Sequence, residues 1–425
     1  MRSLLVIAIA LLGFVSCAVM TSFTYSRMAA KFYDEGDYAN AIQYYTKAVA
    51  NSDQRAETFY WLAMSFYKHG DLEEAMLALE RSLERDSTDV VVTERLAAVH
   101  LDLGNIQKAD FYCKKAIRLD SKYVEAYNTL GHTFYEGGEI DSAEYYFKHA
   151  IALSKALRWR SIGDGEFISF DESLAEAYNG LGEISIARGL FHPALDYFGF
   201  AISLAQNWDT PWFNKGRTYE ALGNMKAAEI AYQRTIDLSP QNSSACKNLA
   251  RMYQKLGRDS EAISLLRRAM RIDSTDVDCC YSLAELYEAK GDNRNAADMY
   301  NKAVDRAPDD PKTYSRAARA NVLIGNYDLA IEFLTEAIEL EPEKAVSHNA
   351  LGEVYQAMGD SVRACPEFEK AIALDTLYTL PLLNLGTIQL EQKKESEGVR
   401  LFIRAARLGD RNAEEFLRSR GVTWK

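Results

Sequence analysis

Histidine and cysteine are the residues whose spacing would first indicate catalysis or metal binding, and neither type forms such a pattern in this chain. The chain has six histidines and six cysteines among its 425 residues. No phosphate-binding glycine loop, His-Glu-x-x-His or Gly-x-Ser-x-Gly motif occurs. The histidines share no spacing typical of metal ligands; they are His69, His100, His132, His149, His192 and His348. We therefore expect a protein that is not an enzyme and that holds no metal and no cofactor.

Cys17 is the one cysteine whose surroundings suggest chemistry, because it follows an apolar segment at the start of the chain. A short basic start precedes an unbroken run of apolar or small residues from Leu4 to Val15. This length is typical of a signal-peptide core and is short for a membrane span. The segment Phe14-Val15-Ser16-Cys17 resembles the bacterial lipoprotein box, although Phe14 stands where leucine is usual. The resemblance implies that residues 1–17 are a signal peptide and that Cys17 is lipidated, with palmitate among its acyl groups.

Two other interpretations of this segment remain open. Ser16-Cys17-Ala18 is also a small-x-small site, so ordinary secretory cleavage after Ala18 would release a soluble periplasmic or secreted protein. A retained anchor from Leu4 to Met20 is the third possibility. All three export the chain across a bacterial inner membrane, and the lipoprotein interpretation predicts a membrane-anchored protein that faces the periplasm.

Composition places the remainder of the chain among globular proteins. Apolar residues make up 48% and charged residues 26%, which argues against disorder and against a polytopic membrane protein. The net charge of −12 argues against a nucleic-acid partner, because phosphate contacts dominate such binding. Length alone suggests two or three ordinary domains.

A 34-residue period changes what that length means. Glycines recur at this spacing as Gly36, Gly70, Gly104 and Gly138, and then as Gly189, Gly223, Gly257, Gly291, Gly325 and Gly359. The next step reaches Lys393. Each glycine follows one apolar-periodic segment and precedes another, so it indicates the turn of a helical hairpin.

Two further positions keep the period and indicate how the hairpins pack. A small residue lies seven places before each turn: Ala29, Ala63, Ala97, Gly131, Gly182, Gly216, Ala250, Ala284, Ala318, Gly352 and Gly386. A mostly large apolar residue lies nine places after it: Tyr45, Leu79, Cys113, Phe147, Phe198, Tyr232, Leu266, Tyr300, Leu334, Phe368 and Phe402. The small residue lets the two helices approach, and the large residue fills the space to the next hairpin.

This pattern resembles the tetratricopeptide repeat (TPR) family. Trp212, Gly216, Tyr219, Tyr232 and Pro240 form a copy close to the family consensus. The resemblance covers about residues 22–410 in eleven copies and implies an all-α, right-handed superhelical α-solenoid of paired helices. We expect repeats 1–4 in 22–155, an insertion in 156–172, repeats 5–11 in 173–410, and a capping helix and tail in 411–425.

In the TPR family the first helix of each pair lines a concave groove, which implies a peptide-binding site. Its predicted residues are Asn214, Arg217, Lys247, Asn248, Arg251, Lys312, Arg316, Arg319 and Asn384. Lys247, Lys312 and Arg316 match three of the five places of the carboxylate clamp of chaperone-binding TPR domains. Asn214, Asn248 and Asn384 match the asparagine ladder of the O-GlcNAc transferase superhelix. Such groups would hold acidic side chains or a terminal carboxylate of an extended peptide; the alternative is an ordinary solvated helix face.

Two clusters of aromatic residues are further candidates. Tyr60, Trp61 and Tyr67 form a predicted aromatic groove near the N-terminus, with padding between helices as the alternative. Trp159, Phe167 and Phe170 lie in the insertion. The insertion either contacts a partner, or it extends the second helix and forms a loop that covers the insertion's own hydrophobic surface.

These observations favour a protein–protein interaction scaffold of the bacterial cell envelope that binds extended peptide segments of other proteins. A glycan- or peptidoglycan-binding accessory protein that uses the aromatic groove is one alternative. A non-catalytic subunit of an envelope enzyme complex is the other.

Overall fold

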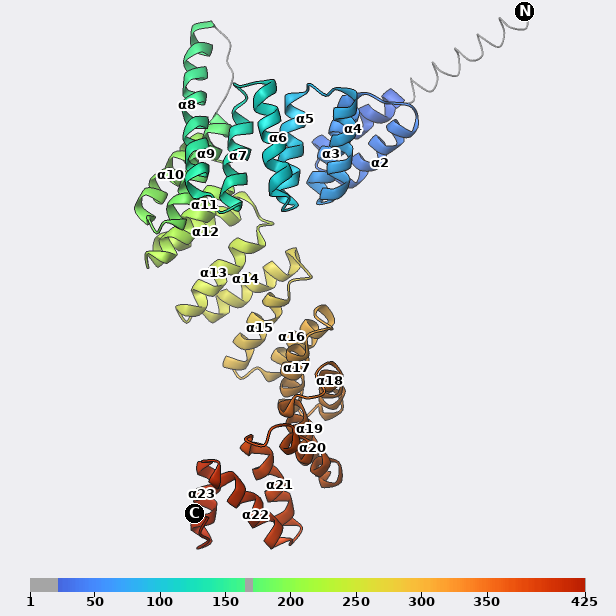
Figure 1. The fold of residues 1–425 in the computed structure, drawn as a ribbon, viewed down its shortest axis with the longest axis vertical. Coiled ribbons are helices and arrows are strands. Elements are labelled where there is room, and N and C mark those ends of the chain that lie inside the picture. The colour runs from blue at the N-terminus through green and yellow to red at the C-terminus, as the bar shows by residue number, and fades with distance from the viewer. Residues whose placement is uncertain (1–21, 165–170, 425) are drawn as a thin grey trace, which may run out of the picture. The chain divides into compact units, whose positions relative to one another are not determined.

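The computed structural model describes residues 22–164 and 171–424, and for residues 158–164 it describes the backbone alone (Figure 1). Within these ranges the chain is helical and has no strand, which confirms the all-α prediction. It folds as two compact units, one ending at Leu238 and the other beginning at Ser239, and each is described by itself.

Unit 1 begins with a helix over residues 22–34, and its further helices follow in hairpins. They are α2 (Tyr38–Ala50), α3 (Ala56–His69), α4 (Leu72–Arg85), α5 (Val90–Asp102), α6 (Ile106–Leu119), α7 (Val124–Glu136), α8 (Ile140–Asp164), α9 (Asp171–Ala187), α10 (Phe191–Leu204), α11 (Asp209–Ala221) and α12 (Met225–Leu238).

Unit 2 continues the same alternation of first and second helices. Its helices are α13 (Ser243–Lys255), α14 (Asp259–Ile272), α15 (Val277–Ala289), α16 (Asn293–Arg306), α17 (Pro311–Leu323), α18 (Tyr327–Leu340), α19 (Ala345–Ala357), α20 (Ser361–Leu374), α21 (Thr379–Glu391), α22 (Glu395–Arg407) and α23 (Arg411–Ser419). The unpaired α23 lies where the sequence predicts a capping helix, and it buries Ala413 and Leu417 against α22.

The periodic glycines form the turns inside the hairpins. All ten adopt positive φ angles, between 70° and 102°, a region that disfavours side chains with a Cβ atom. Lys393, at the eleventh place of the period, also has a positive φ, of 63°. The backbone therefore keeps the same turn geometry where the sequence lacks glycine.

The small and large residues of the period meet as the sequence predicts. A Cβ atom added to Gly131 would lie 2.7 Å from the Phe147 ring, and one added to Gly216 would lie 2.7 Å from the Tyr232 ring. Phe147 also contacts Gly180 of the next hairpin. The large side chain thus fills both the hairpin and the space to its neighbour, and both rings are fully buried.

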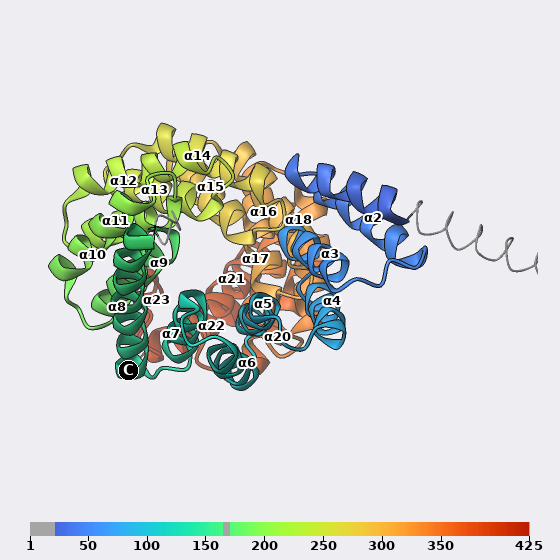
Figure 2. The ribbon, with the colours of Figure 1, turned by 90° about the horizontal axis from the view of Figure 1, so that it is seen from above.

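First helices of neighbouring pairs contact one another in unit 1, where α5 contacts α7 and α7 contacts α9. This places the first helices on the inner side and the second helices on the outer side of the unit (Figure 2). In unit 2, α19 and α21 make the corresponding contact. The inner face of each unit is therefore built from first helices, which carry the predicted groove residues.

The break in the period corresponds to a long second helix. α8 has 25 residues, whereas the second helices α10 and α12 have 14 each. The side chain of Trp159 and all of Phe167 and Phe170 lie outside the described residues, as does Cys17. None of the described helices combines the length and apolarity needed to cross a bilayer.

We predict that Gly216→Ala destabilises the protein by about 1–2 kcal/mol, because the cost of overpacking against Tyr232 exceeds the gain in helix propensity. Gly199→Ala is the matched control, since a Cβ atom there meets nothing within 4 Å. It should stabilise the protein by up to about 1 kcal/mol. Denaturant unfolding of both variants measures the difference, and equal effects would contradict the packing argument.

Candidate functional site

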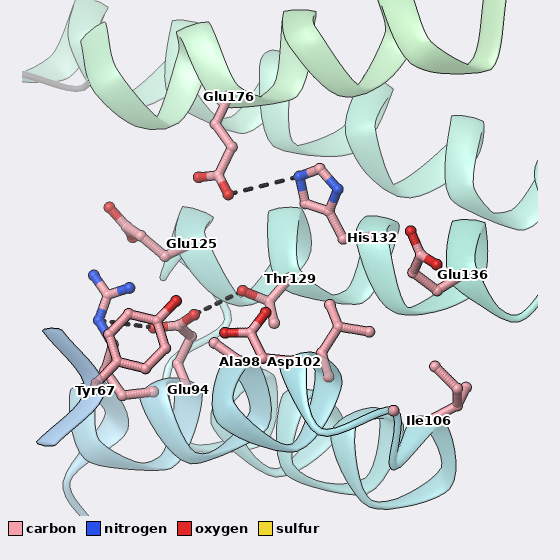
Figure 3. A pocket seen from close by; sticks show the side chains of 13 residues that line it. Tyr67, Glu94, Ala98, Asp102, Ile106, Glu125, Thr129, His132, Glu136 and Glu176 are labelled. Atoms are coloured by element: carbon pink, nitrogen blue, oxygen red, sulfur yellow. Dashed lines mark hydrogen bonds and ion pairs between the residues drawn. The ribbon is translucent and has the colours of Figure 1, made fainter. Parts of the chain in front are cut away.

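The inner face of unit 1 holds a cavity of about 770 Å³ lined by side chains of α3, α5, α7 and α9 (Figure 3). Its lining is rich in carboxylates, which are Glu94, Asp102, Glu125, Glu136 and Glu176. Among the described residues that line it, Arg95 is the one lysine or arginine. The cavity is therefore an acidic surface with a single guanidinium group, and we call it the acidic cavity.

Glu94 is the most deeply placed of these carboxylates, with 1% of its surface exposed. Its Oε1 accepts a 2.6 Å hydrogen bond from the Thr129 hydroxyl on α7. Its Oε2 has no hydrogen-bond donor, and the nearest cationic atom is Nε of Arg95 at 3.6 Å. Burial raises the pKa of Glu94, because removing the carboxylate from water disfavours its charged form.

Glu176 on α9 lies across the cavity from Glu94, and His132 on α7 lies beside Glu176 (Figure 3). The Glu176 carboxylate accepts a 3.2 Å hydrogen bond from Nδ2 of Asn128 and lies 3.7 Å from Nε2 of His132. Burial raises the pKa of Glu176 to about 7. Burial also lowers the pKa of His132, because it disfavours the charged imidazolium form.

A second cavity of about 710 Å³ shares Arg95, Glu125 and Glu176 with the acidic cavity. It continues to Asp171 at the start of α9 and to Trp208 before α11. Glu125 is fixed by a 2.6 Å hydrogen bond from the Ser173 hydroxyl. The two cavities together extend the acidic surface over three successive first helices.

Sequence reasoning missed these carboxylates, although the period places them in the groove. Glu125 and Glu176 each lie thirteen residues before a turn glycine, as does Lys312, and Glu94 lies ten before one, as does Lys247. Reading the same places in repeats 3–5 would have found the acidic surface.

The predicted aromatic groove divides between two places. Tyr60 and Trp61 pack edge to face with ring centroids 5.2 Å apart, and both lie against the core. Trp61 lines a cavity of about 500 Å³ that also has Phe23 in its wall. Tyr67 instead lines the acidic cavity, where burial and the Asp102 carboxylate raise its pKa to about 12. Trp61 and Tyr67 therefore line different cavities, although all three residues pack against the same core cluster.

The basic residues predicted for the groove of unit 2 mostly face carboxylates of the neighbouring helix. Nζ of Lys247 lies 2.6 Å from the buried Asp276, which is the N-cap of α15. Asn248 accepts a 3.0 Å hydrogen bond from the Arg251 guanidinium on the same helix. The Lys247–Asp276 pair joins two neighbouring repeats. The ion pair lowers the pKa of Asp276 and raises the pKa of Lys247.

Three residues on α17 are more open. Arg316 lies 3.5 Å from Glu285 and stacks over the Tyr281 ring, and Arg319 lies 3.2 Å from Glu288. Both arginines are exposed and their carboxylate partners are at least partly exposed, so a ligand can compete for the arginines. The Lys312 side chain is exposed one turn before Arg316. Arg316 and Arg319 also line a cavity of about 360 Å³ with aliphatic walls that include Val346 and Val354.

The asparagines of the predicted ladder join neighbouring repeats through one recurring arrangement. Asn214 donates to Oδ1 of Asn179 at 3.2 Å and to Oε1 of Glu183 at 2.9 Å. Asn384 makes the same two bonds in unit 2, to Asn349 at 3.2 Å and to Glu353 at 3.0 Å.

The amide donors of Asn214 and Asn384 are therefore engaged within the fold. Binding of a peptide backbone by these two residues stays a prediction. Arg217, one turn after Asn214 on α11, is exposed on unit 1.

Three family models match parts of the chain. The model of the Cilia and flagella-associated protein 70 C-terminal domain matches residues 111–350. The model of Anaphase-promoting complex, cyclosome, subunit 3 matches residues 34–116, and the Tetratricopeptide repeat model matches residues 345–376.

Similar solved structures are also helical repeat proteins. A human IFIT1 dimer with PPP-AAAA is 17% identical, with 84% of this chain and 83% of that chain covered and a TM-score of 0.50. Yeast Tom70 is 15% identical, with 93% of each chain covered and a TM-score of 0.36. YrrB, described as a TPR protein with an unusual peptide-binding site, is 19% identical over 44% of this chain and 95% of its own, with a TM-score of 0.39. The likeness to IFIT1 supports the fold alone.

We predict that Glu176→Gln makes the protein more resistant to unfolding at pH 8 but not at pH 4. The folded-state pKa of about 7 exceeds the ordinary value of 4.5, so the folded state binds the proton more tightly than the unfolded state. The free energy of unfolding therefore falls as pH rises from about 4.5 to 7, and it stays lower above pH 7.

A glutamine side chain does not ionise, so the variant does not lose stability in this way as the pH rises. Its amide oxygen still accepts the hydrogen bond from Asn128. Thermal unfolding at both pH values measures the effect, and Glu84→Gln on the exposed end of α4 is the matched control. If the variant differs in stability from the parent protein by the same amount at pH 4 and at pH 8, the raised pKa assigned to Glu176 is contradicted.

Proposed function

Because the chain belongs to the tetratricopeptide repeat family, as the TPR-type model matched over residues 111–350 shows, we propose that it is a protein–protein interaction scaffold. It binds extended segments of partner proteins on the inner face of its first helices. The observation that carries the proposal is that the cavities described above are lined by groove residues of successive first helices, where charged side chains stand beside open space.

In unit 2 the cavity beside α17 suits a segment that ends in, or contains, carboxylates. Arg316 and Arg319 offer guanidinium groups, and Val346 and Val354 offer an aliphatic surface to an adjacent apolar residue. Lys312 adds a third exposed cation on the same helix. Their present partners Glu285 and Glu288 are partly exposed carboxylates, which a peptide carboxylate can replace without leaving a buried charge unpaired.

We also propose that the scaffold acts in a bacterial cell envelope, held to a membrane by a lipid on Cys17. The apolar run from Leu4 to Val15 and the small residue before Cys17 support this part of the proposal. An anchor of this kind would hold the groove close to exported or membrane-bound partners.

We predict that Lys312→Ala combined with Arg316→Ala weakens binding of an acidic peptide with a free C-terminus at least about tenfold, because two charge-assisted contacts are lost. Acetyl-Ala-Asp-Asp-Leu-Val, with a free carboxylate, is a suitable probe, and fluorescence anisotropy of a labelled version gives the Kd. The control variant is Arg294→Ala with Lys302→Ala, which removes the same charge from the second helix α16. Unchanged binding in the first variant would contradict the proposed site.

We predict that Cys17→Ser abolishes incorporation of an alkyne-labelled palmitate when the protein is expressed in a bacterial host. The parent protein should carry the label and sediment with membranes. A parent protein that is soluble and unlabelled would instead support cleavage after Ala18. One that is membrane-bound and unlabelled would support a retained anchor.

A further inference from the structure

We propose that the acidic cavity of unit 1 binds a cationic side chain, arginine or lysine, of a partner protein. This inference rests on the proposed function and adds a second chemistry to it, because the residues expected from sequence favour acidic segments. The cavity lies on α3, α5, α7 and α9, on the same inner face that the proposed function assigns to peptide binding.

The charge balance of the cavity favours a cation. Five carboxylates line it, and Arg95 is their one basic counterpart among the described lining residues. The adjoining cavity contributes two further carboxylates, Asp171 and Glu172. Low-dielectric walls around like charges concentrate a negative potential, and five carboxylates outnumber the single guanidinium group of Arg95, so the cavity attracts a further cation.

A second and independent observation is that the deepest carboxylate has an oxygen without a donor. Oε2 of Glu94 is buried and accepts no hydrogen bond, and Nε of Arg95, 3.6 Å away, is itself buried without an acceptor. Buried polar atoms are rarely left in this state. Half-exposed Arg95 can move aside, and an incoming guanidinium or ammonium group would then supply the missing donor.

Glu176 gives the cation a second contact from the opposite wall. Glu94 comes from α5 and Glu176 from α9, and α7 contributes Thr129 beside Glu94 and His132 beside Glu176 (Figure 3). The Glu176 side chain is 38% exposed, so it is accessible from the cavity. Two carboxylates that approach from different helices match a guanidinium fork or an ammonium group, each of which has several donors.

An inorganic cation fits less well. Within residues 22–164 and 171–424, no group of three or more histidine, cysteine, aspartate or glutamate residues is placed to hold a metal ion. The carboxylates come from three different helices, α5, α7 and α9, that line a cavity of about 770 Å³. This arrangement suits a side chain that enters with its aliphatic stem, and Ala98, Leu101 and Ile106 provide apolar surface for that stem.

The test compares two labelled peptides that differ in charge alone, acetyl-Ala-Ala-Arg-Ala-Ala-amide and the same peptide with citrulline. Binding to the full chain is measured by fluorescence anisotropy at fixed ionic strength. We expect the arginine peptide to bind at least about tenfold more tightly than the citrulline peptide. Glu94→Gln and Glu176→Gln should each weaken the arginine peptide about fivefold and leave the citrulline peptide unchanged.

Glu84→Gln on α4 removes the same charge outside the cavity and should leave both peptides unchanged. Glu176→Gln alone suffices if Glu94→Gln does not fold. Equal binding of the two peptides would overturn the inference, and so would equal weakening by Glu84→Gln. If the acidic probe still binds to unit 2, this inference alone fails; if neither probe binds, the proposed function fails as well.

Discussion

The rest of the structure depends on one contact inside each hairpin. It joins a small residue on the first helix to a large residue sixteen positions later on the second helix. At Gly131 with Phe147 and at Gly216 with Tyr232, even a single added methyl group would overlap the ring. Because this contact recurs at one period, every hairpin closes in the same way and adds to its neighbour with the same face inward. The groove positions of all first helices are fixed as a consequence, whatever side chains occupy them.

Because the fold accepts different side chains at those positions, the residues that stand there determine the chemistry of the inner face. In unit 1 the positions of repeats 3–5 carry Glu94, Glu125 and Glu176, whereas in unit 2 those of α17 carry Lys312 and Arg316. The net charge of −12 is a sum over the whole chain, so it does not describe the local charge of either surface. The recurring asparagine–glutamate contacts between repeats show that some groove positions serve the fold itself, because Asn214 and Asn384 bond to the preceding repeat in the same way.

The repeated architecture could be predicted from sequence because each of its contacts recurs. The turn at Lys393 and the glycine–ring contacts follow from one period, and the helix at 411–419 lies where a cap was predicted after the last repeat. The period places Glu94, Glu125 and Glu176 at groove positions but does not determine which side chains stand there, so the period alone does not predict an acidic cavity. The raised pKa of Glu176 depends on burial by three neighbouring helices, and the pairing of Lys247 with Asp276 depends on the geometry between two repeats. The break in the period shows where the insertion lies, but it does not show whether the insertion lengthens a helix. In the structure, α8 continues without interruption to Asp164.

Site-specific photocrosslinking in cells that contain the partner proteins tests most directly whether the inner face is the binding surface. Benzoylphenylalanine placed at Ala98 in the acidic cavity, or at Val346 in the cavity of unit 2, reports on the inner face. The same group at Phe111, an exposed residue of the second helix α6, reports on the outer face. The account predicts crosslinks to partner proteins from the inner positions and not from Phe111. Crosslinks from Phe111 with none from Ala98 or Val346 would contradict it.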